Sequence, residues 1–347
     1  MSDISIRKSG RAGRITLTRP KALNALSYDM CIAIEKAIDD WRDDPEVAVI
    51  VLDAVGEKAF CAGGDVAQLY ETGKAGDFDF ARRFWADEYR LNNKLHGYPK
   101  PVISFMQGFT MGGGVGIGCH GSHRVVGESS KIAMPECGIG LVPDVGGTLL
   151  LAQAPGRMGE YLGLTGARMG ANDVLRAGFA DYFIPEAKWP NLIAQLEENG
   201  DPFILDRAAT TPPPSKLAEV QEEVDHLFNR ESLSEINAAL SMSDSDFAVG
   251  TLKTLRRNSP LSMACTLEML RRLRGPGIGM VPALAQEYRF TARSLEKGDF
   301  IEGVRAAIID KDRSPNWQHA DWNIPQADVD AMLAPLGDNE LKLEENS

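Results

Sequence analysis

The sequence predicts an α/β protein that continues into a helical C-terminal region. Up to about residue 185, apolar β-branched runs alternate with stretches whose apolar residues recur at helical spacing, which is typical of layered strands and helices. Beyond that point strand signals nearly vanish. The chain has 347 residues, 44% of them hydrophobic, and can bury a sizeable core. We expect an α/β core over residues 1–190 and a helical region over residues 191–347.

The first elements follow this alternation in order. Two short strands, 4–6 and 14–17, flank a glycine turn, and Ser27 is a suitable N-cap for the helix that follows. The buried stripe of that helix consists of Met30, Ile34, Ile38 and Trp41. A continuous β-branched run over 47–52 then predicts a buried strand.

The rest of the core repeats the pattern, and the C-terminal part does not. A helix over 82–95 precedes two more buried strands, 102–106 and 124–126. Residues 210–215 contain three consecutive prolines and predict an extended linker. The amphipathic helices expected after it cover 216–230, 262–274, 281–297 and 299–310.

Charge and composition exclude several classes of partner. The formal net charge is −12 and the sequence pI is about 5.0, whereas proteins that bind nucleic acids or anionic membranes are usually basic. No window approaches the roughly 18 apolar residues of a transmembrane helix. We therefore expect no nucleic-acid partner and no membrane partner.

The cysteines and the N-terminus indicate a reducing compartment. Five cysteines form an odd set without a CxxC pair, which argues against a disulfide framework or a zinc ribbon. Residues 1–9 contain neither an apolar leader segment nor an amphipathic, Arg-rich presequence. We expect a cytoplasmic protein, or one of the mitochondrial matrix if a presequence has been removed.

A glycine cluster, Gly112–Gly118, places five glycines in seven residues. Each glycine inside a helix costs about 1 kcal/mol relative to alanine, so the cluster needs a compensating role. The missing side chains could let a backbone or a ligand approach closely, or the N–H groups could face a developing negative charge. Tight helix packing alone is an equally good explanation. The GxGxxG match at 116–121 follows no strand, so we reject a dinucleotide site.

A second glycine turn, Cys61–Asp65, offers another pair of unobstructed N–H groups before a helix. Taken alone, such a turn is an ordinary loop. Two such turns make an oxyanion hole conceivable, because a thioester carbonyl that becomes an oxyanion or enolate gains its charge on one oxygen.

Two acids lie eight residues apart in an apolar loop rich in glycine and proline, Glu136 and Asp144, with no basic residue between them. Burial and mutual repulsion would raise their carboxyl pKa values and produce an acid/base pair for neutral pH. The alternative is structural and, from spacing alone, somewhat favoured. Asp144 would then cap a helix that begins near Gly147, and Glu136 would pair with a remote arginine.

Other chemistries have weaker signals. His120 and His123 have i, i+3 spacing without a third ligand nearby, so we expect packed or solvated histidines and no metal site. No GxSxG motif occurs, which leaves a serine hydrolase unsupported. Cys137 is more typical of a small buried residue than of a nucleophile.

Taken together, these segments resemble the crotonase (enoyl-CoA hydratase/isomerase) superfamily over residues 3 to about 185. The order and spacing of the motifs are more specific than any one of them. The matching segments are Lys21–Leu26, Phe60–Asp65, Gly112–Gly114, Pro135–Glu136 and Pro143–Gly147. The resemblance implies an α/β fold that is a spiral of ββα units with a helical C-terminal region.

Within the superfamily, the chain is most similar to the branch that hydrolyses the thioester of a short hydroxyacyl-CoA. The acidic stretch 87–93 and the combination of Glu136 with Asp144 are typical of that branch. So are four C-terminal segments, which extend the resemblance over nearly the whole chain: 259–263, 287–289, 299–306 and 310–317.

This resemblance implies roles for individual residues. Glu136 and Asp144 would be catalytic and, with Glu88 and Gly113, would bind the acyl group. The oxyanion hole would consist of the N–H groups of Gly64 and Gly113. The CoA path would be lined by Lys21, Ala22, Leu23 and Ala62. No metal or redox cofactor is required, since CoA is part of the substrate.

Departures from the superfamily pattern select among its reactions. A typical hydratase has a second glutamate two residues past the glycine triplet, where this chain has Gly116, and usually a glycine where this chain has Asp144. These differences favour thioester hydrolysis over hydration. Two alternatives remain, another crotonase activity such as an isomerase or hydratase, and an acyl-CoA-binding protein with a decayed site. The sequence is compatible with a homo-oligomer, although the long C-terminal part argues against the trimer that is common in the superfamily.

Overall fold

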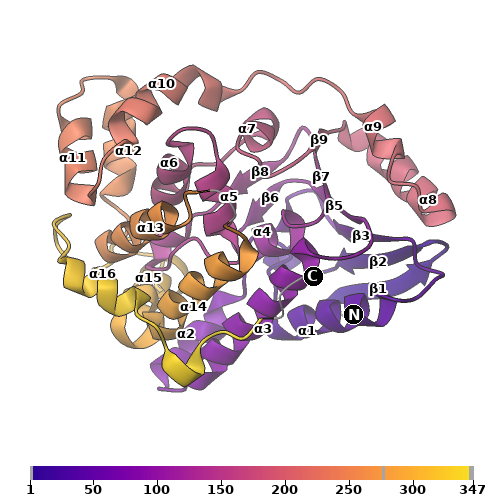
Figure 1. Ribbon diagram of the computed structural model, residues 1–347, viewed down its shortest axis with the longest axis horizontal. Coiled ribbons are helices and arrows are strands. Elements are labelled where there is room, and N and C mark those ends of the chain that lie inside the picture. Colours follow the sequence, from indigo (N-terminus) through magenta and orange to yellow (C-terminus); the bar gives the residue numbers. More distant parts are fainter. Residues whose placement is uncertain (1–2, 276–277, 344–347) are drawn as a thin grey trace.

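The computed structural model describes residues 3–275 and 278–343. A six-stranded sheet forms one layer of the core (Figure 1). Its order is β1-β2-β3-β5-β7-β9, with an antiparallel β1–β2 hairpin and parallel pairing for the rest. The strands are β1 (Ile4–Ser9), β2 (Ala12–Leu17), β3 (Val49–Ala54), β5 (Val102–Met106), β7 (His123–Val126) and β9 (Tyr182–Phe183).

A smaller parallel sheet, in the order β4-β6-β8, accompanies the first. Each of its strands follows a strand of the large sheet, so β3–β4, β5–β6 and β7–β8 are successive repeats of a two-strand unit. Its members are β4 (Ala59–Cys61), β6 (Phe109–Met111) and β8 (Lys131–Ala133). Our sequence analysis missed these strands because three residues are too few to show a periodic pattern.

Helices connect the repeats, as parallel strands require. Helix α1 begins where expected, since the Ser27 hydroxyl accepts a hydrogen bond from the Met30 N–H at 3.3 Å, and its predicted apolar stripe is buried. The helices of this part are α1 (Tyr28–Trp41), α2 (Val66–Lys74), α3 (Phe78–His96), α4 (Gly113–Gly118), α5 (Gly147–Gln153), α6 (Met158–Thr165) and α7 (Ala171–Arg176).

The C-terminal part is helical, as predicted, and wraps around the core (Figure 1). Helices α8 and α9 cover one face of the large sheet, where Trp189 packs on Phe105. The extended linker, residues 209–215, then leads to the remaining helices. They are α8 (Trp189–Asn199), α9 (Ile204–Ala208), α10 (Lys216–Phe228), α11 (Leu233–Ser241), α12 (Asp246–Leu255), α13 (Pro260–Arg272), α14 (Met280–Lys297), α15 (Phe300–Val304) and α16 (Gln326–Leu333).

The last predicted helix, 299–310, differs from the expectation. It begins as α15 and then widens into a π-helical turn, Arg305–Ile309. In the ranges that the structure describes, no helix has both the length and the apolar character needed to cross a bilayer.

One hydrophobic cluster joins the two parts of the chain. It contains Ile34 of α1 and Phe60 of β4 together with Phe290 of α14 and Val329 of α16. Helix α14 packs along α3, and α13 packs on α5 and α6. The division at residue 190 stays a prediction, and the core that positions the site is built from both sides of it.

Candidate active site

A cavity of about 260 Å³ lies where α3, the β6–α4 junction and the loop 135–145 meet. The residues that line it include most of those predicted from the sequence. Phe84, Trp85, Leu141 and Phe300 supply apolar walls between these polar groups. The predicted residues in its lining are Ala62, Gly64, Glu88, Gly113, Glu136 and Asp144.

The two glycine turns bring Gly64 and Gly113 together. Gly63 and Gly112 have positive φ angles, +117° and +47°, which L residues with side chains rarely adopt. These angles set the direction of the N–H groups of the residues that follow, Gly64 and Gly113. A Cβ placed on Gly113 would lie 3.2 Å from the Gly64 nitrogen, so the two amides are neighbours. Neither N–H donates to a backbone carbonyl among the described residues. Two free donors at one wall of the cavity can hold an oxygen that gains charge.

Other members of the glycine cluster serve close packing. A Cβ on Gly114 would lie 2.1 Å from the Cys61 carbonyl oxygen, and one on Gly118 would lie 2.8 Å from the Met106 sulfur. Close packing therefore explains Gly114 and Gly118, whereas an oxyanion-binding N–H group at Gly113 stays a prediction.

Glu136 begins a short 3₁₀ turn, Glu136–Ile139, and is only 5% exposed. Its Oε2 has no hydrogen-bond partner within the described chain, and its Oε1 lies 2.9 Å from the position a Cβ on Gly112 would take. Burial, and secondly the nearby Asp144, raise its pKa well above the ordinary value. The alternative of a remote arginine partner is wrong for the described residues.

Asp144 is held by a tyrosine. The Tyr89 hydroxyl, on α3, donates to Asp144 Oδ2 at 2.7 Å, and the side chain is 5% exposed. Burial raises the pKa of Asp144 to about 7, and the hydrogen bond from Tyr89 partly opposes that shift. The helix-cap alternative is wrong, since the N-cap of α5 is Gly146 and the N–H groups of Gly146 and Thr148 donate to Glu287 instead of Asp144.

Glu88 faces the same cavity from α3. It is 3% exposed, and its Oε1, which lacks a partner in the described structure, lies 2.7 Å from where a Cβ on Gly113 would sit. Burial and then Asp144 raise its pKa well above the usual range. Its neighbour Asp87 points elsewhere and binds Arg90 and Tyr28. Three buried carboxyls thus surround one cavity, an arrangement that favours proton transfer near neutral pH.

The predicted CoA path is divided between two cavities. Lys21 and Leu23 line a second cavity of about 590 Å³. Ala62 lines the first cavity, which we call the carboxyl cavity because Glu88, Glu136 and Asp144 surround it. The Ala62 N–H donates to the Leu23 carbonyl at 3.1 Å, which joins the two walls. Ala22, in the exposed turn Pro20–Ala22, is not among the residues that line either cavity. Leu23 has a left-handed φ of +52°, and the side-chain amide of Asn24 after it donates to the carbonyls of Val55 at 3.1 Å and Ala59 at 2.9 Å.

Two residues to which we assigned no role also support the site. Glu287 on α14 is fully buried and accepts hydrogen bonds from the loop after Asp144. His120 is packed, as expected, and its Nε2 lies 2.7 Å from the Val145 carbonyl oxygen, to which it donates. Burial lowers the pKa of His120 to about 3, so the ring is neutral. The signal for Glu287 was a lone acid among apolar residues on the buried face of an amphipathic helix.

Comparison with known proteins identifies the class. The sequence profile of the enoyl-CoA hydratase/isomerase family matches residues 12–333. The mitochondrial 3-hydroxyisobutyryl-CoA hydrolase of Gallus gallus is 40% identical over 354 aligned positions, 99% of this chain and 91% of that protein. The human protein of the same name is 37% identical, with 98% and 90% covered.

Solved structures agree on the fold. An enoyl-CoA hydratase from Rhodobacter sphaeroides superposes with a TM-score of 0.94 at 55% identity, covering 98% of this chain and all of that one. A carnitinyl-CoA dehydratase from Mycobacterium thermoresistibile gives 0.94 at 40% identity, with 99% and 100% covered. The chain belongs to the enoyl-CoA hydratase/isomerase family. It is a crotonase-fold acyl-CoA enzyme with two mainly parallel sheets and a helical C-terminal region.

Proposed function

We propose that the protein hydrolyses 3-hydroxyisobutyryl-CoA to 3-hydroxyisobutyrate and CoA, the thioester hydrolysis of valine degradation. One observation carries this proposal. Two buried acids, Glu136 and Asp144, share a cavity with the N–H groups of Gly64 and Gly113. At the α4 position where a hydratase has its second glutamate, this chain has Gly116, and a Cβ there would meet Asn92 at 2.6 Å.

Two routes are compatible with this geometry. In the first, a Glu136 oxygen attacks the thioester carbon, the C–S bond breaks, and Asp144 gives a proton to the departing thiolate. Water then cleaves the resulting mixed anhydride. In the second, Glu136 takes a proton from water, which attacks the carbon directly; the C–S bond then breaks and Asp144 gives a proton to the departing thiolate. In both, the N–H groups of Gly64 and Gly113 bind the thioester oxygen as its charge grows.

Substrate binding follows from the walls of the two cavities. The CoA moiety would pass Lys21, Ala22, Leu23 and Ala62, mostly along the backbone, and the acyl hydroxyl would face Glu88. No metal or redox cofactor enters either route. The named relatives are mitochondrial hydrolases, and we propose a bacterial cytoplasm or a mitochondrial matrix as the location.

A second candidate is another crotonase reaction, enoyl-CoA hydration or isomerisation, because the two similar solved structures are titled hydratase and dehydratase. Against it, no carboxylate replaces the second glutamate at Gly116. A third candidate is an acyl-CoA-binding protein without activity, which the intact pair of acids disfavours.

The test is a substrate panel. Purified protein is incubated with 3-hydroxyisobutyryl-CoA, 3-hydroxypropionyl-CoA and crotonyl-CoA, while free thiol and enoyl absorbance are recorded in parallel. We expect rapid thiol release from the hydroxyacyl substrates and no loss of enoyl absorbance with crotonyl-CoA. Loss of enoyl absorbance without thiol release would replace hydrolysis by hydration. Saturable CoA binding without either signal would indicate a binding protein.

A further inference from the structure

Helix α14 reaches the acid loop through the buried carboxylate of Glu287. Its Oε2 accepts the Gly146 N–H at 2.8 Å, and its Oε1 accepts the Thr148 N–H at 3.0 Å and the Thr148 hydroxyl. Gly146 is the second residue after Asp144. A C-terminal side chain, absent from the two routes above, thus binds the backbone that carries one of the two acids.

The loop needs such a restraint because of its conformation. Val145 has a φ of +54°, in the left-handed region, where a β-branched residue is strained, and Gly146 follows at +79°. His120 holds the Val145 carbonyl on one side, and Glu287 holds the Gly146 N–H on the other. These contacts keep residue 144 at the cavity wall instead of in a relaxed turn.

The same face of α14 also reaches the side chain of Asp144 indirectly. Thr291 lies one turn after Glu287, and its hydroxyl oxygen is 3.4 Å from that of Tyr89, which donates to Asp144. Glu287 and Thr291 thus approach the site from one helix, α14, which packs along α3. Helix α14 therefore contacts the backbone just after Asp144 through Glu287, and the tyrosine that binds its carboxylate through Thr291.

We propose that Glu287 is a positioning residue that acts through Asp144: it fixes the loop 144–148 so that the Asp144 carboxylate faces Glu136 and the sulfur of the bound thioester. This inference rests on the proposed hydrolysis. A carboxyl group suits the role, because its two oxygens accept the Gly146 and Thr148 N–H groups, and the Thr148 hydroxyl can accept as well as donate, so the contacts persist when Glu287 carries a proton. A glutamine at 287 would turn an NH₂ group toward an N–H or hydroxyl donor and lose at least one contact.

The test is a double-mutant cycle on thiol release, with Glu287→Gln, Asp144→Asn and the double variant. We expect Asp144→Asn to lower kcat about 100-fold or more, the usual range for general acid–base catalysis, and Glu287→Gln about 10-fold or more. The double variant should match Asp144→Asn alone, because one residue acts through the other. The affinity for a non-hydrolysable thioether analogue should change less than threefold in Glu287→Gln.

Gln286 supplies the matched control on the same helix. Its buried amide donates to the Met269 carbonyl at 3.1 Å, a purely structural contact, so Gln286→Leu should lower the Tm and leave kcat unchanged. Multiplied kcat losses in the double variant, or a Glu287→Gln protein with full kcat, would overturn the positioning role. If the wild type releases no thiol but hydrates crotonyl-CoA, the proposed function fails separately, and the same cycle is measured on hydration.

Discussion

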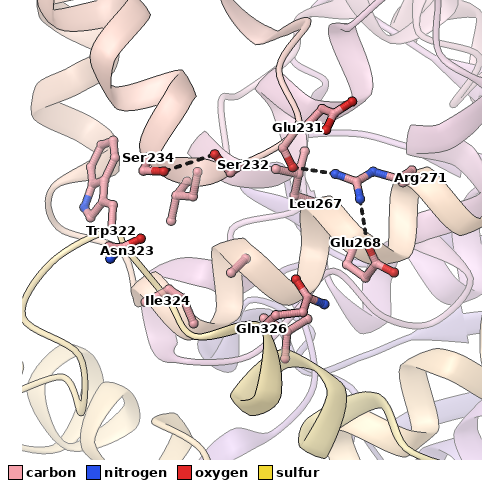
Figure 2. Close-up of a pocket in the computed structure, with 13 residues that line it drawn as sticks. Glu231, Ser232, Ser234, Leu267, Glu268, Arg271, Trp322, Asn323, Ile324 and Gln326 are labelled. Atoms are coloured by element: carbon pink, nitrogen blue, oxygen red, sulfur yellow. Dashed lines mark hydrogen bonds and ion pairs between the residues drawn. The ribbon is translucent and has the colours of Figure 1, made fainter.

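Two cavities of this protein differ in whether the polar side chains that line them have hydrogen-bond partners. The carboxyl cavity of about 260 Å³ has unpartnered, buried oxygens on Glu88 and Glu136. The other, of about 80 Å³, lies between α11, α13 and the segment before α16 (Figure 2). There Arg271 binds Glu268 at 3.2 Å and the Glu231 carbonyl, and Ser232 binds Ser234 at 3.0 Å.

The contrast distinguishes polar side chains that stabilise the fold from polar side chains that are available to a substrate. No lining residue of the Figure 2 cavity has a buried, unpartnered side-chain atom in the described ranges, so that cavity costs the fold nothing in lost hydrogen bonds. Each unpartnered oxygen in the carboxyl cavity costs roughly 1–3 kcal/mol. Such a cost is typical of a surface that a substrate completes on binding.

Glu136→Gln is the strongest test of this contrast. The change keeps the shape of the side chain and removes the carboxylate that, in the two proposed routes, attacks the thioester or activates water. We expect kcat for thiol release to fall about 1,000-fold, while the thioether analogue still binds within a few-fold of the wild-type Kd. Unchanged turnover would remove Glu136 from the mechanism and leave its unpartnered oxygen unexplained.

The dependence of stability on pH tests whether the buried carboxyls carry protons. Burial raises the pKa of Glu287 from 4.5 to about 8, so the folded state retains a proton that the unfolded chain releases between pH 4.5 and 8. Its contribution to stability is complete below pH 4.5 and is lost as the pH rises through 8. The difference in Tm between wild type and Glu287→Gln should therefore shift against the wild type by a few degrees from pH 5 to 8. A difference independent of pH would contradict the raised pKa.

Asn92→Leu extends the comparison to the wall behind the cavity. Asn92 is fully buried beside Val145 and Gly116, and neither atom of its amide has a partner in the described chain. Leucine has a similar shape and no unpaired polar group, so we expect the Tm to rise by about 1–3 °C. Because the amide adjoins the acid loop, turnover should fall several-fold.

Ser262→Ala is the control for Asn92→Leu. Ser262, on α13, also has a buried, unpartnered oxygen, and removing it should not lower turnover. A lower Tm in Asn92→Leu would mean that the Asn92 amide supports the fold.

The smallest effect is expected in the Figure 2 cavity. Ser234→Ala removes the hydroxyl that binds Ser232 at 3.0 Å, a partly buried contact at the N-terminus of α11. We expect the Tm within about 1 °C and kcat within twofold of wild type. A clear loss of turnover would show that the Figure 2 cavity also takes part in the reaction.

The sequence predicted the layers of the fold better than its details. Long elements such as β3 and α1 carry enough periodic residues to be recognised, and Ser27 marks the start of α1. The strands of the small sheet are three residues long and pair across crossovers, so only tertiary contacts define them. The π-helical turn at 305–309 likewise has no local sequence pattern.

The site was predictable where the chain is unusual locally. Glycine clusters and acids in an apolar loop are visible in the sequence, but only the resemblance to the crotonase superfamily grouped Gly113, Glu136 and Asp144 into one site, and the structure places all three around one cavity. The residue that holds the loop lies more than 140 positions away, and the hydrogen bond between Glu287 and Gly146 exists only after α14 has packed along α3. Periodicity can place Glu287 on a buried face, but not opposite a particular N–H group.

That distance along the chain has a consequence for how the protein is made. During synthesis the first part of a chain leaves the ribosome and begins to fold before the last part exists. Glu136 and the two glycine turns belong to the early part, whereas Glu287 emerges only in the final fifth. In a chain that ends before α14, the loop 144–148 would keep its contacts with Tyr89 and His120 but lack those with Glu287, so the full set of contacts around Asp144 would form only near the end of translation.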